Sequence, residues 1–170
     1  NVEKLLERCL ASLPAACEGL DWEVVVVDNA SKDNSVEAAQ RVALELTHAF
    51  HLPSSTCQTI ANLDKRGFAR ACNQGLVDSE ARNVLLLNPD TECPRGSLSA
   101  LVKLADARPK AGIIGPKITY PDGCYQPSVR GFPTVGSQAG ILLKLHHLIP
   151  WLPTFRRYFA DRLETEREQI

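Results

Sequence analysis

The sequence lacks several features, and some of these absences exclude a class of protein. No apolar run comes near the roughly 20 residues that a spanning helix needs, which argues against a transmembrane helix. The sequence also contains no methionine and no CxxC pair. The six cysteines and four histidines form no cluster with zinc-ligand spacing, which argues against a zinc site. Because most cysteines lie in apolar patterns, we expect reduced core residues in a cytoplasmic protein rather than a disulfide scaffold.

An excess of positive charge is also missing. Lys and Arg number 19 against 20 Asp and Glu, so the formal net charge is only -1. Proteins that bind nucleic acid usually carry a clustered excess of Lys and Arg. We therefore expect no nucleic-acid partner. The 170 residues are enough for one domain with an appended segment.

Strand and helix patterns alternate along most of the chain. The four consecutive valines of "WEVVVVDNAS" are typical of a strand covered on both faces. We expect further strands near residues 59–61, 84–87 and in "AGIIGPKITY", and helices at residues 2–13 (closed by Pro14), 31–46, 68–77 and 98–107. This alternation predicts an α/β fold with a mostly parallel sheet flanked by helices.

The two ends of the chain depart from this alternation. The chain starts at Asn1 directly with a helical pattern, so we expect a strand to precede it in a longer protein. After Arg130 no further strand pattern occurs, and two helical pieces separated by Pro150 and Pro153 are predicted.

Polar residues follow three of the predicted strands, in residues 28–31, 62–67 and 88–90. Ligands of open parallel sheets bind beyond the carboxyl ends of the strands, so we expect these segments to converge on one edge. A strand-end Asp is also common as a helix cap or turn former, and for each segment that alternative stays open.

The glycine patterns of other sheet-based sites do not occur. The sequence has no GxGxxG after its first strand, no GxxxxGK[ST] and no GxSxG. What remains is a set of carboxylates and amides. Such groups can hold a base and a ribose by hydrogen bonds, and a pyrophosphate through a divalent cation.

Three segments, "VVVVDNASKDNSV", "GFARACNQGL" and "LLLNPDTE", resemble in order and spacing the family 2 glycosyltransferases with the GT-A fold. The resemblance is to the rhamnosyltransferase-like branch, which builds bacterial polysaccharides and cell-wall linkers. It implies a nucleotide-sugar-binding GT-A domain at residues 1–135 that lacks its first strand. Residues 136–170 would form a helical segment, either part of the acceptor side or facing a membrane.

The resemblance also implies roles for single residues. Asp28 would accept a hydrogen bond from the pyrimidine of the donor, and Asn73 would line the nucleotide pocket. Together with the strand ends, the expected substrate-binding residues are Asp28, Asn29, Asn62, Gly67, Asn73, Asn88 and Asp90.

Asp90 would be the last acidic residue of the family's Asp-x-Asp motif and would bind Mg or Mn. Asn88 occupies the first position, where an amide binds a divalent cation more weakly than a carboxylate. The alternative is that Asp90 only caps the turn begun by Pro89. Lys65 is a second departure, because the branch commonly has Asn there. It could contact a phosphate or be merely solvated.

The implied reaction is an inverting transfer of a sugar from a UDP- or dTDP-sugar to a polysaccharide or lipid-linked acceptor. Such a transfer needs a general base, which the resembled family carries beyond a stretch like "RRYFADRLETE". Asp161, Glu164 and Glu166 lie in a mixed-charge helical pattern typical of a solvated face, so we nominate no catalytic residue. We expect little sugar transfer by this chain alone.

Other functions remain open at this point. The chain could be a non-catalytic nucleotide-sugar-binding or scaffolding module, or a nucleotidyltransferase, whose glycine-rich loop would lie in a region this chain lacks. Residues 141–159 are basic, aromatic and amphipathic. They could rest on the inner face of the cell membrane or pack against the remainder of an enzyme. The sequence does not predict an oligomeric state.

Overall fold

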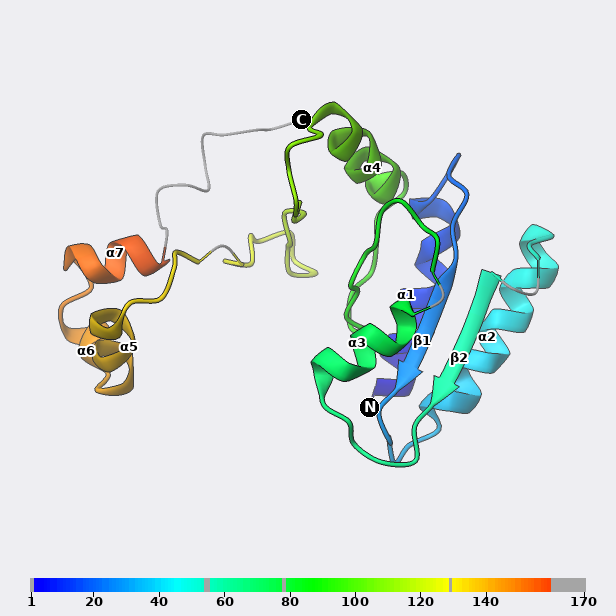
Figure 1. Ribbon diagram of the computed structural model, residues 1–170, viewed down its shortest axis with the longest axis horizontal. Coiled ribbons are helices and arrows are strands. Elements are labelled where there is room, and N and C mark those ends of the chain that lie inside the picture. The colour runs from blue at the N-terminus through cyan, green and yellow to red at the C-terminus, as the bar shows by residue number, and fades with distance from the viewer. Residues whose placement is uncertain (1, 54–55, 78, 129, 160–170) are drawn as a thin grey trace. The chain divides into compact units, whose positions relative to one another are not determined.

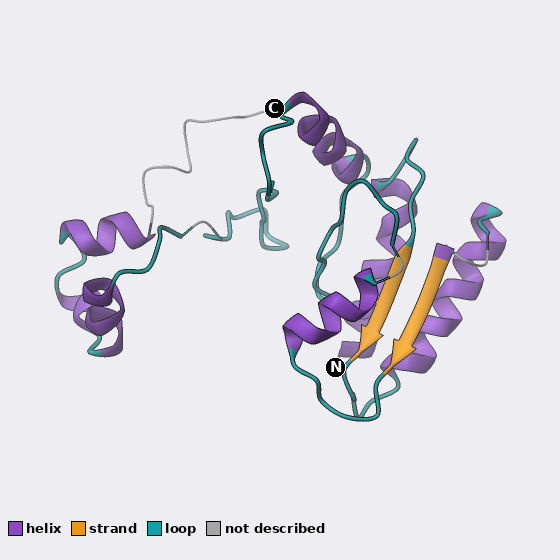
Figure 2. Cartoon of the chain, in the orientation of Figure 1, coloured by secondary structure: helices purple, strands orange, loops and turns teal. Residues whose placement is uncertain are grey.

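The computed structural model describes residues 2–53, 56–77, 79–128 and 130–159 (Figure 1). It divides into two compact units, unit 1 at Asn1–Ile114 and unit 2 at Gly115–Ile170, and each is described by itself. Unit 1 has the predicted α/β architecture, with a short parallel sheet flanked by helices (Figure 2). Unit 2 is helical, with extended segments before its first helix.

The elements of unit 1 are α1 (Val2–Ala16), β1 (Val24–Asp28), α2 (Ser35–Phe50), β2 (Cys57–Ala61), α3 (Phe68–Leu76) and α4 (Ser97–Ala107). The elements of unit 2 are α5 (Val135–Leu142), α6 (Leu145–Leu148) and α7 (Pro153–Phe159). None of the described helices is long and apolar enough to cross a membrane.

β1 and β2 are parallel neighbours joined by the crossover helix α2. Val24 lies opposite Cys57 and Asp28 opposite Ala61, so both strands end at the same edge of the sheet. The pairing continues one step further, because the backbone N–H of Asn62 donates to the carbonyl of Asp28 at 3.0 Å. This edge carries the first two predicted polar segments.

Helices cover β1 on both faces, as the run of valines predicts. Val24 and Val26 pack against the core formed by α1 and α2. Val25 and Val27 face α3, where a Cβ added at Gly75 would lie 3.2 Å from Val27 Cγ2. In Figure 1, α3 accordingly lies in front of β1, with α1 and α2 behind the sheet.

The core of unit 1 lies between α1 and α2. Buried apolar side chains recur at helical spacing on both helices and form one cluster: Leu6, Leu10, Leu13, Ala39, Val42 and Leu46. Each fully buried Leu or Val stabilises the fold by about 1.5–3 kcal/mol relative to exposure. Trp22 and Leu87 pack against this cluster from connecting segments, and Leu98 packs against it from α4. The core thereby holds the loops as well as the sheet.

The strand predicted at residues 84–87 does not form. This segment is extended but has no regular strand partner, because the described sheet contains only β1 and β2. Leu87 packs on the core, whereas Val84, Leu85 and Leu86 are 46–59% exposed. A run of apolar residues indicates burial, but a strand also needs a neighbouring backbone to pair with.

Three other predictions needed correction. The segment "AGIIGPKITY" forms no strand and contributes only a single antiparallel bridge between Thr119 and Tyr125. Pro14 does not end α1, which continues to Ala16, and Cys17 N–H still donates to the Leu13 carbonyl at 2.8 Å. The C-terminal segment contains three short helices instead of two pieces.

Unit 2 is built around close contacts between α5 and α7. Thr134 caps α5, and its hydroxyl accepts from the backbone N–H of Ser137 at 3.1 Å. Phe155 of α7 is buried against Gly140 of α5, where an added Cβ would clash with the ring. Gly131 N–H donates to the Tyr158 carbonyl at 2.8 Å, which ties the segment before α5 to α7.

The thiols of α1 and its C-terminal end are held protonated. Burial, with the nearby Cys93 as the next cause, raises the pKa of Cys9 and of Cys17 from 9.0 to about 11; Asp90 contributes further at Cys9. Both side chains are almost fully buried. They therefore act as small apolar core groups rather than as reactive thiolates.

These thiols predict a pH dependence of stability. Between pH 9 and 11 the unfolded chain loses protons that the folded chain keeps, so the free energy of unfolding should fall as pH rises. The fall is up to about 3 kcal/mol for each thiol, and below pH 9 these groups add no pH dependence. Urea unfolding followed by circular dichroism at pH 8 to 11 measures it. The Cys9→Ala/Cys17→Ala variant should decline less steeply, and an equal decline would contradict the prediction.

Candidate functional site

The loop after β1 presents a carboxylate at the sheet edge. Asp28 Oδ2 accepts from the backbone N–H of Ser31 at 3.0 Å, which closes a tight turn, and Ala30 takes the left-handed conformation there at φ 61°. Asp28 is half-buried, and among the described residues no donor reaches its Oδ1. One carboxylate oxygen thus shapes the loop while the other can accept a hydrogen bond from a ligand.

Two side-chain hydrogen bonds connect the loops after β1 and β2. Asn29 Oδ1 accepts from the backbone N–H of Arg66 at 2.8 Å, directly before α3. Asn62 is buried, and its Nδ2 donates to Gln74 Oε1 at 3.0 Å. Asn29 and Asn62 therefore act in this structure as supports that hold the Asp28 loop and α3 together.

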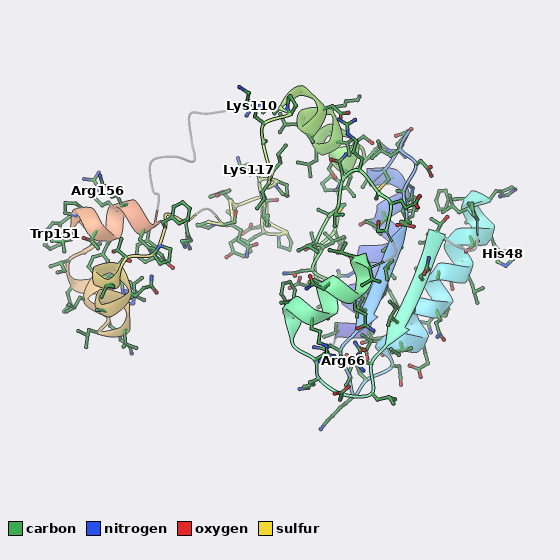
Figure 3. All side chains as sticks on the ribbon, in the orientation of Figure 1. His48, Arg66, Lys110, Lys117, Trp151 and Arg156 are labelled. Carbon is green, nitrogen blue, oxygen red and sulfur yellow. The ribbon has the colours of Figure 1, made fainter. Side chains whose placement is uncertain are left out.

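A shallow hollow of about 270 Å³ lies along α3 next to these loops. It is lined by Arg66, Arg70, Asn73, Gln74 and Val77. The exposed Asn73, expected to line the nucleotide pocket, is among the residues that line this hollow. Figure 3 shows Arg66 beside the carboxyl ends of the two strands.

Gly67 begins α3 with φ 78° and ψ 159°, a backbone conformation that side chains with a Cβ rarely adopt. It lets the chain turn sharply between Arg66, which is tied to Asn29, and the helix that carries Asn73. Gly67 thus contributes through its backbone. Lys65, the residue that departs from the resembled branch, is exposed on the same loop.

The sequence did not single out Arg66 and Arg70, although both line the hollow. The guanidinium of Arg66 forms an ion pair with Asp64 at 3.2 Å, while Arg70 has no ion-pair partner among the described residues. Arg70, Asn73 and Val77 follow the i, i+3, i+7 spacing of one helix face, whereas Arg66 lies in the loop before α3. That periodicity in "FARACNQGLV" is the signal that could have found Arg70.

The third polar segment, residues 88–90, is supported by α1. The thiol of Cys9 lies 3.7 Å from the carbonyl oxygen of Asn88 and donates to it. Ser12 donates its hydroxyl to the Cys9 carbonyl at 2.7 Å and accepts from the backbone N–H of Cys93 at 3.0 Å. The turn at Asp90 is therefore held between two fixed points on one helix.

Further contacts continue this attachment toward the start of α4. Gly96 N–H donates to the Ala15 carbonyl at 2.9 Å. Two exposed ion pairs, Arg8 with Glu92 at 3.3 Å and Arg95 with Glu18 at 2.8 Å, join the same segments. Exposed pairs contribute little energy each. The backbone and thiol contacts set the path of the loop.

The structure connects the first two segments directly and supports the third separately. Hydrogen bonds join the loops that carry Asp28, Asn29, Asn62 and the start of α3. The hydrogen bonds of residues 88–96 run instead to α1. Asp161, Glu164 and Glu166 lie outside the described residues.

The side chains near Asp90 meet the needs of a divalent cation only in part. The described residues contain no group of three His, Cys, Asp or Glu side chains that could hold a metal. Asp90 is exposed and, within the described ranges, takes part in no hydrogen bond or ion pair, whereas Glu92 is paired with Arg8. Mg²⁺ commonly binds one or two carboxylates and completes its shell with substrate phosphates and water. The residues present fit a cation that arrives with a phosphorylated ligand.

Comparison with known families identifies a relationship over most of the chain. The model of the family described as Glycosyl transferase family 2 matches residues 1–163. This match confirms the resemblance carried by the three sequence segments. No solved structure matches the chain significantly.

The curated relatives are glycosyltransferases of bacteria. N-acetylglucosaminyl-diphospho-decaprenol L-rhamnosyltransferase from two strains of Mycobacterium tuberculosis is 34% identical over 172 residues. The alignment covers 97% of this chain and 53% of the relative, so the chain spans about half the relative's length. Undecaprenyl-phosphate 4-deoxy-4-formamido-L-arabinose transferase of Pseudomonas syringae pv. syringae is 30% identical over 110 residues, 62% of this chain and 30% of that protein.

The attachment of residues 88–96 to α1 gives a testable prediction. Ser12→Ala removes the acceptor of the Cys93 N–H and should lower the free energy of unfolding by about 1–2 kcal/mol. Ser12→Thr keeps the hydroxyl and should retain most of the stability. Urea unfolding measures both effects. An alanine variant as stable as the parent would show that this bond does not hold the loop.

Proposed function

Because the chain belongs to glycosyl transferase family 2, we propose that unit 1 binds the nucleotide part of a UDP- or dTDP-sugar, and that the protein transfers the sugar to a lipid-linked glycan acceptor with inversion. The observation that carries the proposal is the open Oδ1 of Asp28, held at the sheet edge next to the hollow along α3. The names of the curated relatives support a lipid-linked acceptor. Such an acceptor would bring the reaction to the inner face of the membrane.

The geometry favours a uracil or thymine base for a chemical reason. These bases carry an N3–H donor, which a carboxylate oxygen accepts, whereas cytosine presents a bare acceptor at N3 and would be repelled. Oδ1 of Asp28 is available for that bond because the Ser31 N–H occupies Oδ2. A hydrogen bond to a charged acceptor contributes about 1.5–3 kcal/mol, enough to select between bases.

The basic groups of the hollow suit the diphosphate. Arg70 lies on the same face of α3 as Asn73, and Arg66 lines the hollow from the loop before α3, so a nucleotide held at Asp28 and Asn73 would have cationic groups nearby. Of the two, Arg70 is without an ion-pair partner in the described part of the chain. Arg is suited to phosphate recognition because its guanidinium donates two parallel hydrogen bonds.

Asp90 and Asn88 are proposed to hold a divalent cation together with the donor phosphates. When bound, Mg or Mn would supply positive charge against the departing nucleoside diphosphate. Asp90 offers the carboxylate, and the Cys9 and Ser12 contacts fix the turn that presents it. Because Asn88 is neutral, cation binding should depend on the nucleotide.

Nucleotide titration tests the donor site. We expect the chain to bind dTDP or UDP in the presence of Mn more tightly than CDP in calorimetric titration. Asp28→Asn keeps an oxygen for the Ser31 N–H but removes the charge, and should weaken dTDP binding roughly 10- to 100-fold. Binding of CDP by this variant should strengthen instead, because the amide removes the repulsion and can donate to N3 of cytosine, so the preference for dTDP over CDP should shrink or reverse. Equal affinities for dTDP and CDP in the parent would refute the role of Asp28.

The metal proposal is tested at residues 88 and 90. Asn88→Asp adds a second carboxylate and should strengthen Mn binding about tenfold, with detectable binding in the absence of nucleotide. Asp90→Ala should abolish the dependence of dTDP binding on Mn. Electron paramagnetic resonance of free Mn measures the first effect and calorimetry the second.

Two results would contradict the metal proposal. Metal-dependent nucleotide binding that persists in Asp90→Ala would remove Asp90 from the metal site. An unchanged Mn affinity in Asn88→Asp would show that this turn does not meet the cation. Nucleotide binding by a full-length protein that lacks transferase activity would instead support the binding-module alternative.

A further inference from the structure

One segment of unit 2, residues 123–159, differs in charge from the rest of the chain; the acidic residues of the unit lie on either side of it, at Asp122, Asp161, Glu164, Glu166 and Glu168. Residues 123–159 contain no Asp or Glu, although the chain has 20 acidic residues. The same segment carries Arg130, Lys144, Arg156 and Arg157. Arg130 lies over the ring of Phe159 at 5.5 Å. Residues 123–159 offer no carboxylate that could pair with Lys144, Arg156 or Arg157, so the positive charge of these side chains is not neutralised within the segment.

Large apolar side chains are exposed in the same unit. Leu142, Leu148 and Trp151 are 84%, 72% and 66% exposed, and Phe132 before α5 is 97% exposed. Leu142 and Leu148 end α5 and α6, and Trp151 lies in the connection between α6 and α7. Phe155 fills the contact between α5 and α7, so the exposed side chains are not part of that contact. An apolar set of this size marks a surface that binds something.

A basic hollow lies next to these residues. It has a volume of about 420 Å³, and its lining includes Phe132, Thr134, Arg157 and Tyr158. The cation and the aromatic rim suit a phosphate attached to an apolar body. Figure 3 shows Trp151 and Arg156 projecting outward from neighbouring positions of unit 2.

We infer that unit 2 binds the surface of a bilayer that contains anionic phospholipid, through the exposed apolar residues of 132–152 and the cations Lys144, Arg156 and Arg157. Trp and Leu would enter the interface between headgroups and acyl chains, while the basic side chains would meet the lipid phosphates. The described helices include none that could span the membrane, so the contact is interfacial.

The chemistry favours lipid over other partners of negative charge. Nucleic acid would match the cations but would leave the exposed Leu, Phe and Trp side chains in water. A bilayer satisfies both halves of the surface at once. The inference stands on unit 2 alone and does not require the donor site of unit 1 to be correct.

Vesicle binding of the 170-residue chain tests the inference. We expect the chain to sediment with vesicles of phosphatidylcholine mixed with phosphatidylglycerol, much less with phosphatidylcholine alone, and less again at high salt. The Trp22→Phe variant leaves Trp151 as the single tryptophan. Its emission should shift to shorter wavelength on binding, and lipids brominated on the acyl chains should quench it.

Matched variants separate this surface from general charge effects. Arg156→Gln/Arg157→Gln should lower the vesicle partition coefficient roughly tenfold or more, because each basic group near the surface contributes to binding. Lys103→Gln/Lys110→Gln removes the same charge from exposed positions of unit 1 and should change it far less. Trp151→Ala should also weaken binding. Circular dichroism checks that each variant keeps its helices.

Several outcomes would overturn the inference. These are no sedimentation with phosphatidylglycerol vesicles, sedimentation without a change in Trp151 emission, or equal losses in the two charge variants. The first of these would favour a protein partner for the apolar surface. Titration of the Arg156→Gln/Arg157→Gln variant with dTDP keeps the two proposals distinct. Lost vesicle binding with unchanged dTDP affinity concerns unit 2 only, and absent dTDP affinity concerns unit 1 only.

Discussion

The parallel backbone pairing of β1 and β2 is the constraint on which the arrangement of unit 1 depends. It brings two chain segments to one edge, and the bond from Asn62 N–H to the Asp28 carbonyl extends it into the loops. From there the amide of Asn29 reaches the backbone of Arg66 and fixes the start of α3. The polar groups beyond the strands are thus placed by the strand pairing together with the side-chain hydrogen bonds of Asp28, Asn29 and Asn62, and one oxygen of Asp28 stays available to a ligand.

Helix α1 also positions other parts of unit 1, and its two faces contact different segments. Its leucines form the core with α2, while Cys9, Ser12 and the Ala15 carbonyl hold residues 88–96. Because burial raises the pKa of Cys9 to about 11, the thiol stays protonated and can keep donating to Asn88 at neutral pH. The position of Asp90 therefore follows from the packing of a helix that is remote in sequence.

The sequence predicted those elements whose cause is local. The four valines predicted β1 and the helix predicted at 68–77 matches α3 closely, whereas α2 begins and ends four residues later than predicted. It failed at residues 84–87, since the apolar run shows a tendency to be buried but not the partner that a strand requires. It also missed the Cys9 contact to Asn88, which joins residues 79 positions apart, and the supporting role of Gln74 against Asn62. Contacts of this kind depend on the tertiary fold.

Positive and negative side chains are distributed differently in the two units, although the chain as a whole is nearly neutral. In unit 1 the described ion pairs neutralise Arg8, Arg41, Arg66, Arg82 and Arg95 with carboxylates of the same unit. Positive charge there remains local, as at Arg70 beside the hollow. Within unit 2, residues 123–159 hold no carboxylate and their charges are all positive, whereas the acidic residues of the unit lie before and after this segment. A net charge of -1 thus conceals a basic surface, because composition averages over groups that lie in different parts of the protein.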